Sequence, residues 1–268
     1  MYLILFYNKL KNQKMKRNVL LALSTLLLMS CGAMHHKVIH QEKNIHWSYA
    51  GDGNPENWSY ISEAYKDCGG KAQSPINIET QKVKQVLDKH SLKINYNSSK
   101  VNIVNNGHTV QFNISAKNNL IFNGKSYELK QFHLHSLSEH TIDSKYSPLE
   151  VHFVNKATDN TYAVISVLFK EGDVSPFFEK FLSKLPKKEG KYSEDQSFVI
   201  REMLSQTSQF YHYKGSFTTP PCTEVVEWIV LTERLTASKT QLDQLHALLD
   251  NNYRPTQLIN KREVELQK

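Results

Sequence analysis

The chain has 268 residues, 40% of them hydrophobic and 10% aromatic, which is enough for one domain with a large core or for two small domains. Its formal net charge is +7, but the lysines stand singly or in pairs among acidic residues. That distribution is typical of a solvated surface and argues against a nucleic-acid-binding protein. A mean hydropathy of −0.50 predicts a soluble mature chain.

The N-terminal segment predicts export. Lys16 and Arg17 precede an apolar run at residues 19–29, which is too short for a comfortable membrane span and typical of a secretory signal. Met15 is an alternative start of the protein, because the residues before it add only a further apolar patch and lysines. We therefore assign residues 1–30 to a signal peptide and expect an exported, periplasmic protein.

Cys31 follows this signal directly. The sequence Leu-Met-Ser-Cys-Gly at 28–32 resembles a bacterial lipobox, although Met29 fits it imperfectly. In that interpretation Cys31 carries a lipid anchor and residues 31–44 form a tether. The alternative is ordinary cleavage near Ala33, which leaves the same residues as a linker.

Two cysteines remain once Cys31 is removed or lipidated, Cys68 and Cys222. An even pair in an oxidising compartment is expected to form a disulfide. The alternative is a pair of free buried thiols.

Residues 45–268 show no low-complexity break and no internal repeat, and they predict one domain. Runs of β-branched and aromatic residues, with Asn-Gly turn signals at 106–107 and 123–124, predict strands. The predicted strands are 93–97, 100–107, 109–115, 119–124, 127–135, 149–156 and 162–170, and residues 215–231 predict a loop that leads into another strand. Few helices are expected, among them 175–185 and 237–250, so the predicted fold is mainly β with peripheral helices.

The stretch QFHLH predicts half of a metal site. Side chains alternate between the two faces of a strand, so His133 and His135 share one face while Phe132 and Leu134 point into the core. A catalytic zinc site needs three protein ligands and one open position. His152, in the apolar strand LEVHFV, is the expected third ligand, on an antiparallel neighbour.

Two further residues fit a support role. Gln131 stands two residues before His133, and Glu150 two residues before His152, each on the face of its histidine. Either side chain can accept the outer N–H of the imidazole and fix its tautomer. A bare His-x-His pair is weak evidence for metal, but its combination with a downstream Glu-x-His on a second apolar strand favours zinc.

At this point the sequence resembles a known family. The segments QSPINI, NNGHTV, QFHLH, SEHTID, LEVHF, SFTTPPC, EWIVL and NNYRP are similar to those of the α-class carbonic anhydrases, from residue 46 to about residue 262. The resemblance implies a large, twisted, mostly antiparallel sheet of about ten strands. It also implies zinc-dependent reversible hydration of CO2 to bicarbonate and a proton, with His133, His135 and His152 as ligands. The pair Cys68 and Cys222 matches the disulfide of exported members.

The resemblance further implies roles for individual residues. Thr218, with Glu139 accepting its proton, would orient a zinc-bound hydroxide, and His108 would serve as the proton shuttle. Tyr49 and Asn106 match positions that order the connecting waters. The substrate pocket would be formed by Val154, Val164, Phe217, Thr219 and Trp228. Phe217 departs from the leucine usual in the family, and its larger ring is expected to narrow the pocket. Pro221 is expected to follow a cis peptide bond. His140 matches the family but is expected to be structural rather than a ligand.

Two other classes of protein remain as alternatives. One is a binding protein, since some relatives have lost a zinc histidine, and the other is a zinc-holding periplasmic chaperone. The complete histidine set on rigid strands argues against both. The expected partners are CO2 and bicarbonate as small-molecule substrates, no nucleic acid, and a membrane only through Cys31. Both a monomer and a homodimer are compatible with the sequence.

Overall fold

The computed structural model describes residues 46–204 and 207–268, apart from the side chains of residues 194–196. The predicted signal peptide, Cys31 and the tether at residues 31–44 lie outside the described residues. In the described part of the chain, no helix is both long enough and apolar enough to span a membrane.

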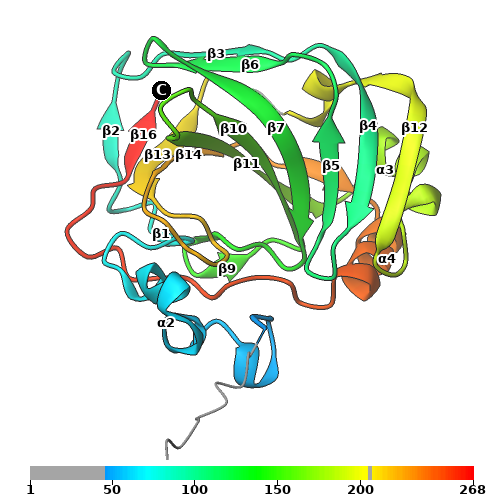
Figure 1. Ribbon diagram of the computed structural model, residues 1–268. Coiled ribbons are helices and arrows are strands. Elements are labelled where there is room, and N and C mark those ends of the chain that lie inside the picture. The colour runs from blue at the N-terminus through cyan, green and yellow to red at the C-terminus, as the bar shows by residue number, and fades with distance from the viewer. Residues whose placement is uncertain (1–45, 205–206) are drawn as a thin grey trace, which may run out of the picture. The chain divides into compact units, whose positions relative to one another are not determined.

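A sheet of 13 strands dominates this part of the chain, as the resemblance predicted (Figure 1). Ten strands follow one another along its continuous path, and nine of the twelve strand pairings are antiparallel. In spatial order the path runs β12 (Gly190–Val199), β4 (Ser98–Asn105), β5 (Val110–Ile114), β7 (Lys125–His135), β10 (Leu149–Lys156), β11 (Tyr162–Glu171), β14 (Val226–Leu231), β13 (Phe210–Gly215), β16 (Glu265–Gln267) and β2 (Lys84–Val86).

The remaining strands are short. Off the path, β3 (Leu92–Asn95) pairs with β6 (Asn119–Phe122), β6 with β7, and β15 (Leu235–Ala237) with β11. A separate small sheet contains β1 (Asn77–Ile78), β8 (Thr141–Ile142) and β9 (Lys145–Tyr146).

Helices occupy the periphery. The α-helices are α2 (Trp58–Ile61), α3 (Pro176–Phe181) and α4 (Lys239–Leu249), and the 3-10 helices are Gly51–Gly53, Glu63–Gly69, Leu182–Lys184 and Ile200–Met203. Ser238 and Gln241 form a reciprocal capping box that begins α4. Ser175 is the N-cap residue of α3, but its side chain makes no capping hydrogen bond.

The predicted strands are confirmed within a few residues, and β10 at both ends. Polar β12 and aromatic β13 were not predicted. The expected loop before β14 is also present, and the Pro220–Pro221 bond is cis as expected.

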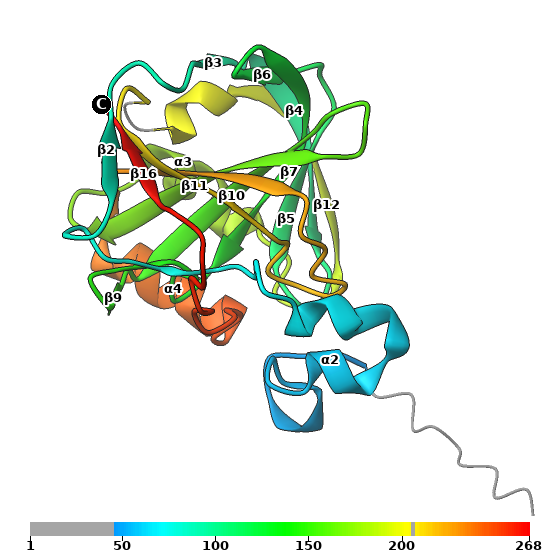
Figure 2. The same ribbon diagram turned by 90° about the vertical axis from the view of Figure 1, so that its left-hand side faces the viewer.

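A β-bulge in β7 determines which side chains face the core. Tyr127, Leu129, Phe132 and Leu134 all belong to the main hydrophobic core, so the spacing changes from two to three across Lys130. The pairing of β7 with β10 shifts register at the same point. An extra residue at a bulge moves every following side chain to the other face of the strand. Residues 131, 133 and 135 therefore point away from the main core. Figures 1 and 2 show the course of β7 and β10 in the curved sheet.

The main core lies on the opposite face of these strands. Phe132 stacks on Phe112 at a ring distance of 4.5 Å and packs against Phe153 at 5.1 Å. Helices α3 and α4 add apolar side chains to the same core, among them Phe178, Phe181, Leu242, Leu245 and Leu249. A rigid apolar layer thus backs the strand pair that carries the histidines.

The predicted disulfide is present. Cys68 and Cys222 are joined, with their Cα atoms 4.8 Å apart, and both are buried beside Trp58. The Arg254 guanidinium lies 5.4 Å from the Trp58 ring and donates a hydrogen bond of 2.8 Å to the Cys68 carbonyl. The disulfide therefore ties the loop before β14 to the N-terminal segment.

We expect replacement of both bridging cysteines, Cys68→Ser with Cys222→Ser, to lower the free energy of unfolding. The bridge spans 154 residues, and the loss of loop-closure entropy from the unfolded chain predicts about 5 kcal/mol. Guanidinium unfolding of the oxidised protein and of the double variant measures this. A reducing agent should bring the wild type to the variant's stability and leave the variant unchanged, and equal stability of both oxidised proteins would contradict the prediction.

Candidate metal centre

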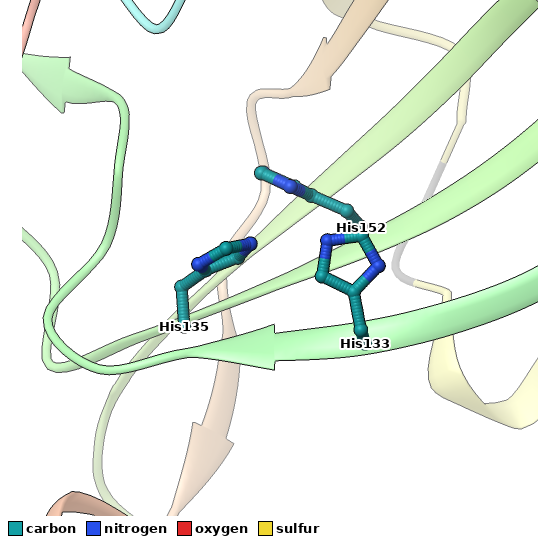
Figure 3. A group of neighbouring side chains, drawn as sticks. All are labelled: His133, His135 and His152. Atoms are coloured by element: carbon teal, nitrogen blue, oxygen red, sulfur yellow. The ribbon is translucent and has the colours of Figure 1, made fainter. Parts of the chain in front are cut away.

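Three imidazoles from two neighbouring strands lie close together (Figure 3). His133 and His135 extend from the end of β7, and His152 lies directly opposite His133 on β10. Their ring centres are 4.7–5.3 Å apart, and one nitrogen of each ring lies within 4.8 Å of the others. His135 and His152 are each 1% exposed.

An outer acceptor fixes the tautomer of each ring. His133 donates from Nδ1 to the Gln131 side-chain oxygen at 2.9 Å, and His152 donates from Nε2 to Glu150 at 2.7 Å. His135 donates from Nδ1 to the backbone carbonyl of Asn252 at 2.7 Å. The nitrogens left with lone pairs are therefore Nε2 of His133, Nε2 of His135 and Nδ1 of His152.

The protonation state of these rings suits a metal. Burial is the main cause that lowers the pKa of all three, to about 4 for His135 and well below the usual value for His133. Neutral imidazole is the form that binds zinc. In addition, Nε2 of His135 is buried and has no hydrogen-bond partner in the described part of the chain, which is costly unless an ion occupies the site. Three neutral nitrogen donors of this kind fit a zinc ion.

Glu150 is the most heavily bonded carboxylate near the centre. It accepts from the backbone N–H groups of Glu139 and His140, from both His140 and His152 rings, and from the Ser166 hydroxyl. Burial raises its pKa, but the interactions with His140 and His152 outweigh burial and hold the pKa well below the usual range. Glu150 is thus an ionised group in a fully buried position.

His140 lies beside Glu150, but neither of its ring nitrogens is free to bind a metal. Its Nδ1 is 2.7 Å from Glu150, and its Nε2 is 2.7 Å from the Tyr213 hydroxyl. Because both ring nitrogens already have partners, His140 is structural here.

Glu139 and Thr218 lie beside the triad. Oε1 of Glu139 accepts from the Arg254 backbone N–H at 2.8 Å, and Oε2 is 3.5 Å from Nε2 of His135. Burial raises the pKa of Glu139, while the adjacent His152 and the Thr218 hydroxyl lower it. Burial is the larger effect, and the resulting pKa is about 7. Oε2 nevertheless has no well-aligned hydrogen bond within the described residues. The two side chains are still close enough for the Thr218 hydroxyl to lower the pKa of Glu139.

His108 lines a cavity of about 460 Å³. The His108 ring lies flat on Trp47 at 3.7 Å, and His46 stacks nearby at 5.2 Å. Asn106 holds the turn beneath it by accepting from the His108 and Thr109 N–H groups. Tyr49 lines the same cavity. Burial, followed by the charge of Glu139, raises the Tyr49 pKa well above its usual value.

The predicted pocket residues form an apolar wall. Val154 and Val164 face each other across β10 and β11, and Val164 faces Trp228 across β11 and β14. They share a buried cluster, against which Phe217 packs. The Trp228 ring is 4.8 Å from His152, so this wall adjoins the triad. Thr219 follows Thr218 on the loop, and its carbonyl accepts from the Cys222 N–H.

Sequence reasoning missed Asn252. Its carbonyl orients His135, its side-chain oxygen accepts from the Ser136 N–H, and its amide donates to the His108 and Leu134 carbonyls. One residue therefore connects the triad with the turn that carries His108. The motif NNYRP contains Asn252 and Arg254, but it lies in a segment without strand or helix, where no periodicity relates these residues to their partners.

Comparisons with known proteins identify related sequences and structures. The family described as eukaryotic-type carbonic anhydrase matches residues 53–268. The carbonic anhydrase of Pectobacterium carotovorum is 38% identical over 224 residues, 82% of this chain and 90% of that protein. The carbonic anhydrase of Neisseria gonorrhoeae is 36% identical over 245 residues, 90% of this chain and 95% of that protein. The structure of the α-carbonic anhydrase from Thermovibrio ammonificans with the inhibitor sulfanilamide has a TM-score of 0.78 and 37% identity, covering 82% of this chain and 98% of that one.

We expect Glu150→Gln to destabilise the protein by about 3 kcal/mol at neutral pH, because an amide presents a donor to groups that all donate. The folded-state pKa of Glu150 is depressed, so its contribution is present above its ordinary pKa of 4.5 and is lost as the pH falls toward the folded value. Urea unfolding between pH 7 and pH 3 measures this. The free energies of unfolding of the wild type and of Glu150→Gln should approach each other as the pH falls.

The matched control is Glu128→Gln on β7, which is exposed and pairs with Lys130. It should change stability by no more than about 0.5 kcal/mol. A Glu150→Gln protein as stable as this control at pH 7 would show that the buried carboxylate is dispensable.

Proposed function

Because this chain belongs to the eukaryotic-type, or α-class, carbonic anhydrase family, we propose that it catalyses the zinc-dependent reversible hydration of CO2 to bicarbonate and a proton. The observation that carries the proposal is the set of three neutral imidazoles whose lone pairs converge on one point. Each ring is held by an outer acceptor, so the donors are in place before an ion arrives.

His133, His135 and His152 would hold the ion. When bound, zinc supplies a Lewis acid that lowers the pKa of a coordinated water to about 7. Three neutral ligands leave the positive charge of the ion undiminished, which favours that effect. Gln131, Glu150 and the Asn252 carbonyl act through the rings, because they keep the metal-facing nitrogens unprotonated.

Thr218 and Glu139 would orient the nucleophile. A hydroxyl has one proton to donate. If the Thr218 hydroxyl gives that proton to Glu139, its oxygen can only accept from a group that still carries a proton. The Arg254 N–H on Oε1 leaves Oε2 of Glu139 for this purpose. The pair would thus aim the nucleophile and reject ligands without a proton.

CO2 has no net dipole, so an apolar wall beside the metal suits it. Val154, Val164 and Trp228 would supply that wall, with Phe217 packed against them. Thr219 would line the same pocket. Phe217 also packs edge-on against Tyr162 at 4.7 Å. Its ring would narrow the pocket without touching the groups that hold the ion.

His108 would carry the proton from the site to solvent. Histidine titrates near neutrality, and burial and the charge of His46 lower the His108 pKa from its usual value. The ring is stacked on Trp47 and lines the cavity, and rotation would turn it toward the site or toward water. Tyr49 and Asn106, which line the same cavity as His108, would order the water chain between the ring and the ion.

Export completes the proposal. The Cys68–Cys222 disulfide supports an oxidising compartment. We infer cleavage of residues 1–30, a domain at residues 45–268 and a periplasmic location, with Cys31 as the proposed lipid anchor. The enzyme would act as a monomer or a homodimer.

We expect purified protein to accelerate CO2 hydration in a stopped-flow pH-indicator assay, and a strong chelator to remove both the activity and one zinc per chain. His135→Ala should abolish activity and zinc binding together. The control is His246→Ala, an exposed histidine on α4 that should keep both. Zinc-loaded protein without hydration activity would favour a binding protein instead.

We expect His108→Ala to lower the turnover number, on the order of 10- to 100-fold, in weakly buffered solution, because a general acid–base group is removed. Imidazole in the assay should restore the rate, since it carries the same proton from outside. The ratio kcat/KM should change little, because interconversion of CO2 and bicarbonate does not require His108. Full turnover in dilute buffer without imidazole would refute the assignment.

A further inference from the structure

A second group of ligand-type side chains lies outside the triad. His212 on β13 and Glu265 on β16 face each other in register, and His90 reaches them from the loop between β2 and β3. The three side chains are only 6–9% exposed. One potential ligand atom of each lies within 4.8 Å of the others.

His212 already has the arrangement expected of a metal ligand. Its Nε2 is 2.7 Å from Glu227, which accepts the N–H and fixes the tautomer. Nδ1 then carries the lone pair and points toward Oε2 of Glu265 at 3.8 Å. The same pattern, a ring with a carboxylate behind it, occurs at His152 and Glu150 in the triad.

Glu265 is an ionised carboxylate with a removable partner. Burial raises its pKa, but Lys89 and His90 overcome that effect and lower it to about 2. His90 contacts it through Nε2 at 2.7 Å, and the Lys89 ammonium binds the other oxygen. The Lys89 side chain is 51% exposed, so it can turn into water and make room for another cation.

We propose that His90, His212 and Glu265 form a second divalent-metal site, suited to zinc or a similar ion. Two imidazoles and one carboxylate are a zinc ligand set, and water would fill the fourth position. The ion would join β13, β16 and the loop before β3. Strand β13 leads directly into the loop that carries Thr218. An ion at this site would therefore stabilise the strand from which that loop extends, without taking part in the reaction.

One hydrogen bond makes this site weaker than the triad. The Asn123 side-chain oxygen accepts from the Ser91 N–H at 3.0 Å, so its amide nitrogen donates to Nδ1 of His90. The His90 proton therefore sits on Nε2, the atom that must bind the ion. Metal binding has to move that proton to Nδ1, where Asn123 offers no acceptor.

An aspartate at position 123 would remove this obstacle. Its two oxygens can accept from both the Ser91 N–H and the His90 Nδ1–H. Asn123 adopts φ of 50°, in the left-handed region, where aspartate is among the better tolerated residues. Asn123→Asp is therefore a gain-of-binding variant, and it avoids the risk that a loss-of-binding variant simply fails to fold.

The test is calorimetric titration of Zn²⁺ into the wild-type enzyme whose first zinc is already bound. We expect the wild type to bind one further zinc ion per chain, and this ion to raise the Tm. Both effects should be lost in His90→Gln and in His212→Gln. Asn123→Asp should raise the affinity for the second zinc ion by about 10-fold, which is the size of effect expected from a hydrogen-bond acceptor behind a metal-binding histidine. Near-ultraviolet circular dichroism checks that each variant is folded.

The matched control is Asn119→Asp, which adds the same charge to β6. Asn119 bonds to Ser126 rather than to His90. This variant should bind the second zinc like the wild type. Absence of a second equivalent, its survival in folded His90→Gln and His212→Gln, or equal tightening by Asn119→Asp and Asn123→Asp would overturn the proposal.

Discussion

The buried charge of Glu150 is the constraint on which the centre depends. An ionised carboxylate in the middle of a sheet is tolerated only when every oxygen lone pair is used. Its partners come from β10, from β11 and from the segment after β7, so those elements must meet at one point. His140 extends the network to the Tyr213 hydroxyl, which in turn donates to Ser74. One charge thereby sets the relative position of strands that are far apart in sequence.

The C-terminal segment completes this arrangement from the other side. Asn252 joins His135 to the His108 turn, and Arg254 joins Glu139 to the disulfide segment through the Cys68 carbonyl. Both residues are nearly fully buried. The metal ligands, the orienting carboxylate and the proposed proton carrier are therefore not independent groups. A disturbance at residues 252–254 would reach all of them through these hydrogen bonds.

The part of the centre that the sequence predicts correctly depends on the two-residue periodicity of β-strands. Alternation on β7 and β10 placed His133, His135 and His152 on one face, and the two-residue spacing placed Gln131 and Glu150 behind them. The bulge at Lys130 left that part of the pattern intact because it precedes Gln131. Strand β12 was missed because its sequence is polar, and it is a strand only through its pairing with β4. Asn252 and Arg254 were missed because they stand in a segment without strand or helix, where no periodicity relates them to the residues that they contact.

The two groups of histidines differ in which ring nitrogen carries the proton. In the triad each ring has an acceptor behind it, so each metal-facing nitrogen holds a lone pair before any ion is present. In the second group only His212 meets this condition, through Glu227, while His90 faces an amide donor. The identity of the ligands is therefore a poor guide to affinity. The outer partners decide whether a set of imidazoles is ready for a metal or must first move a proton, and in this fold they rank the triad well above the second group.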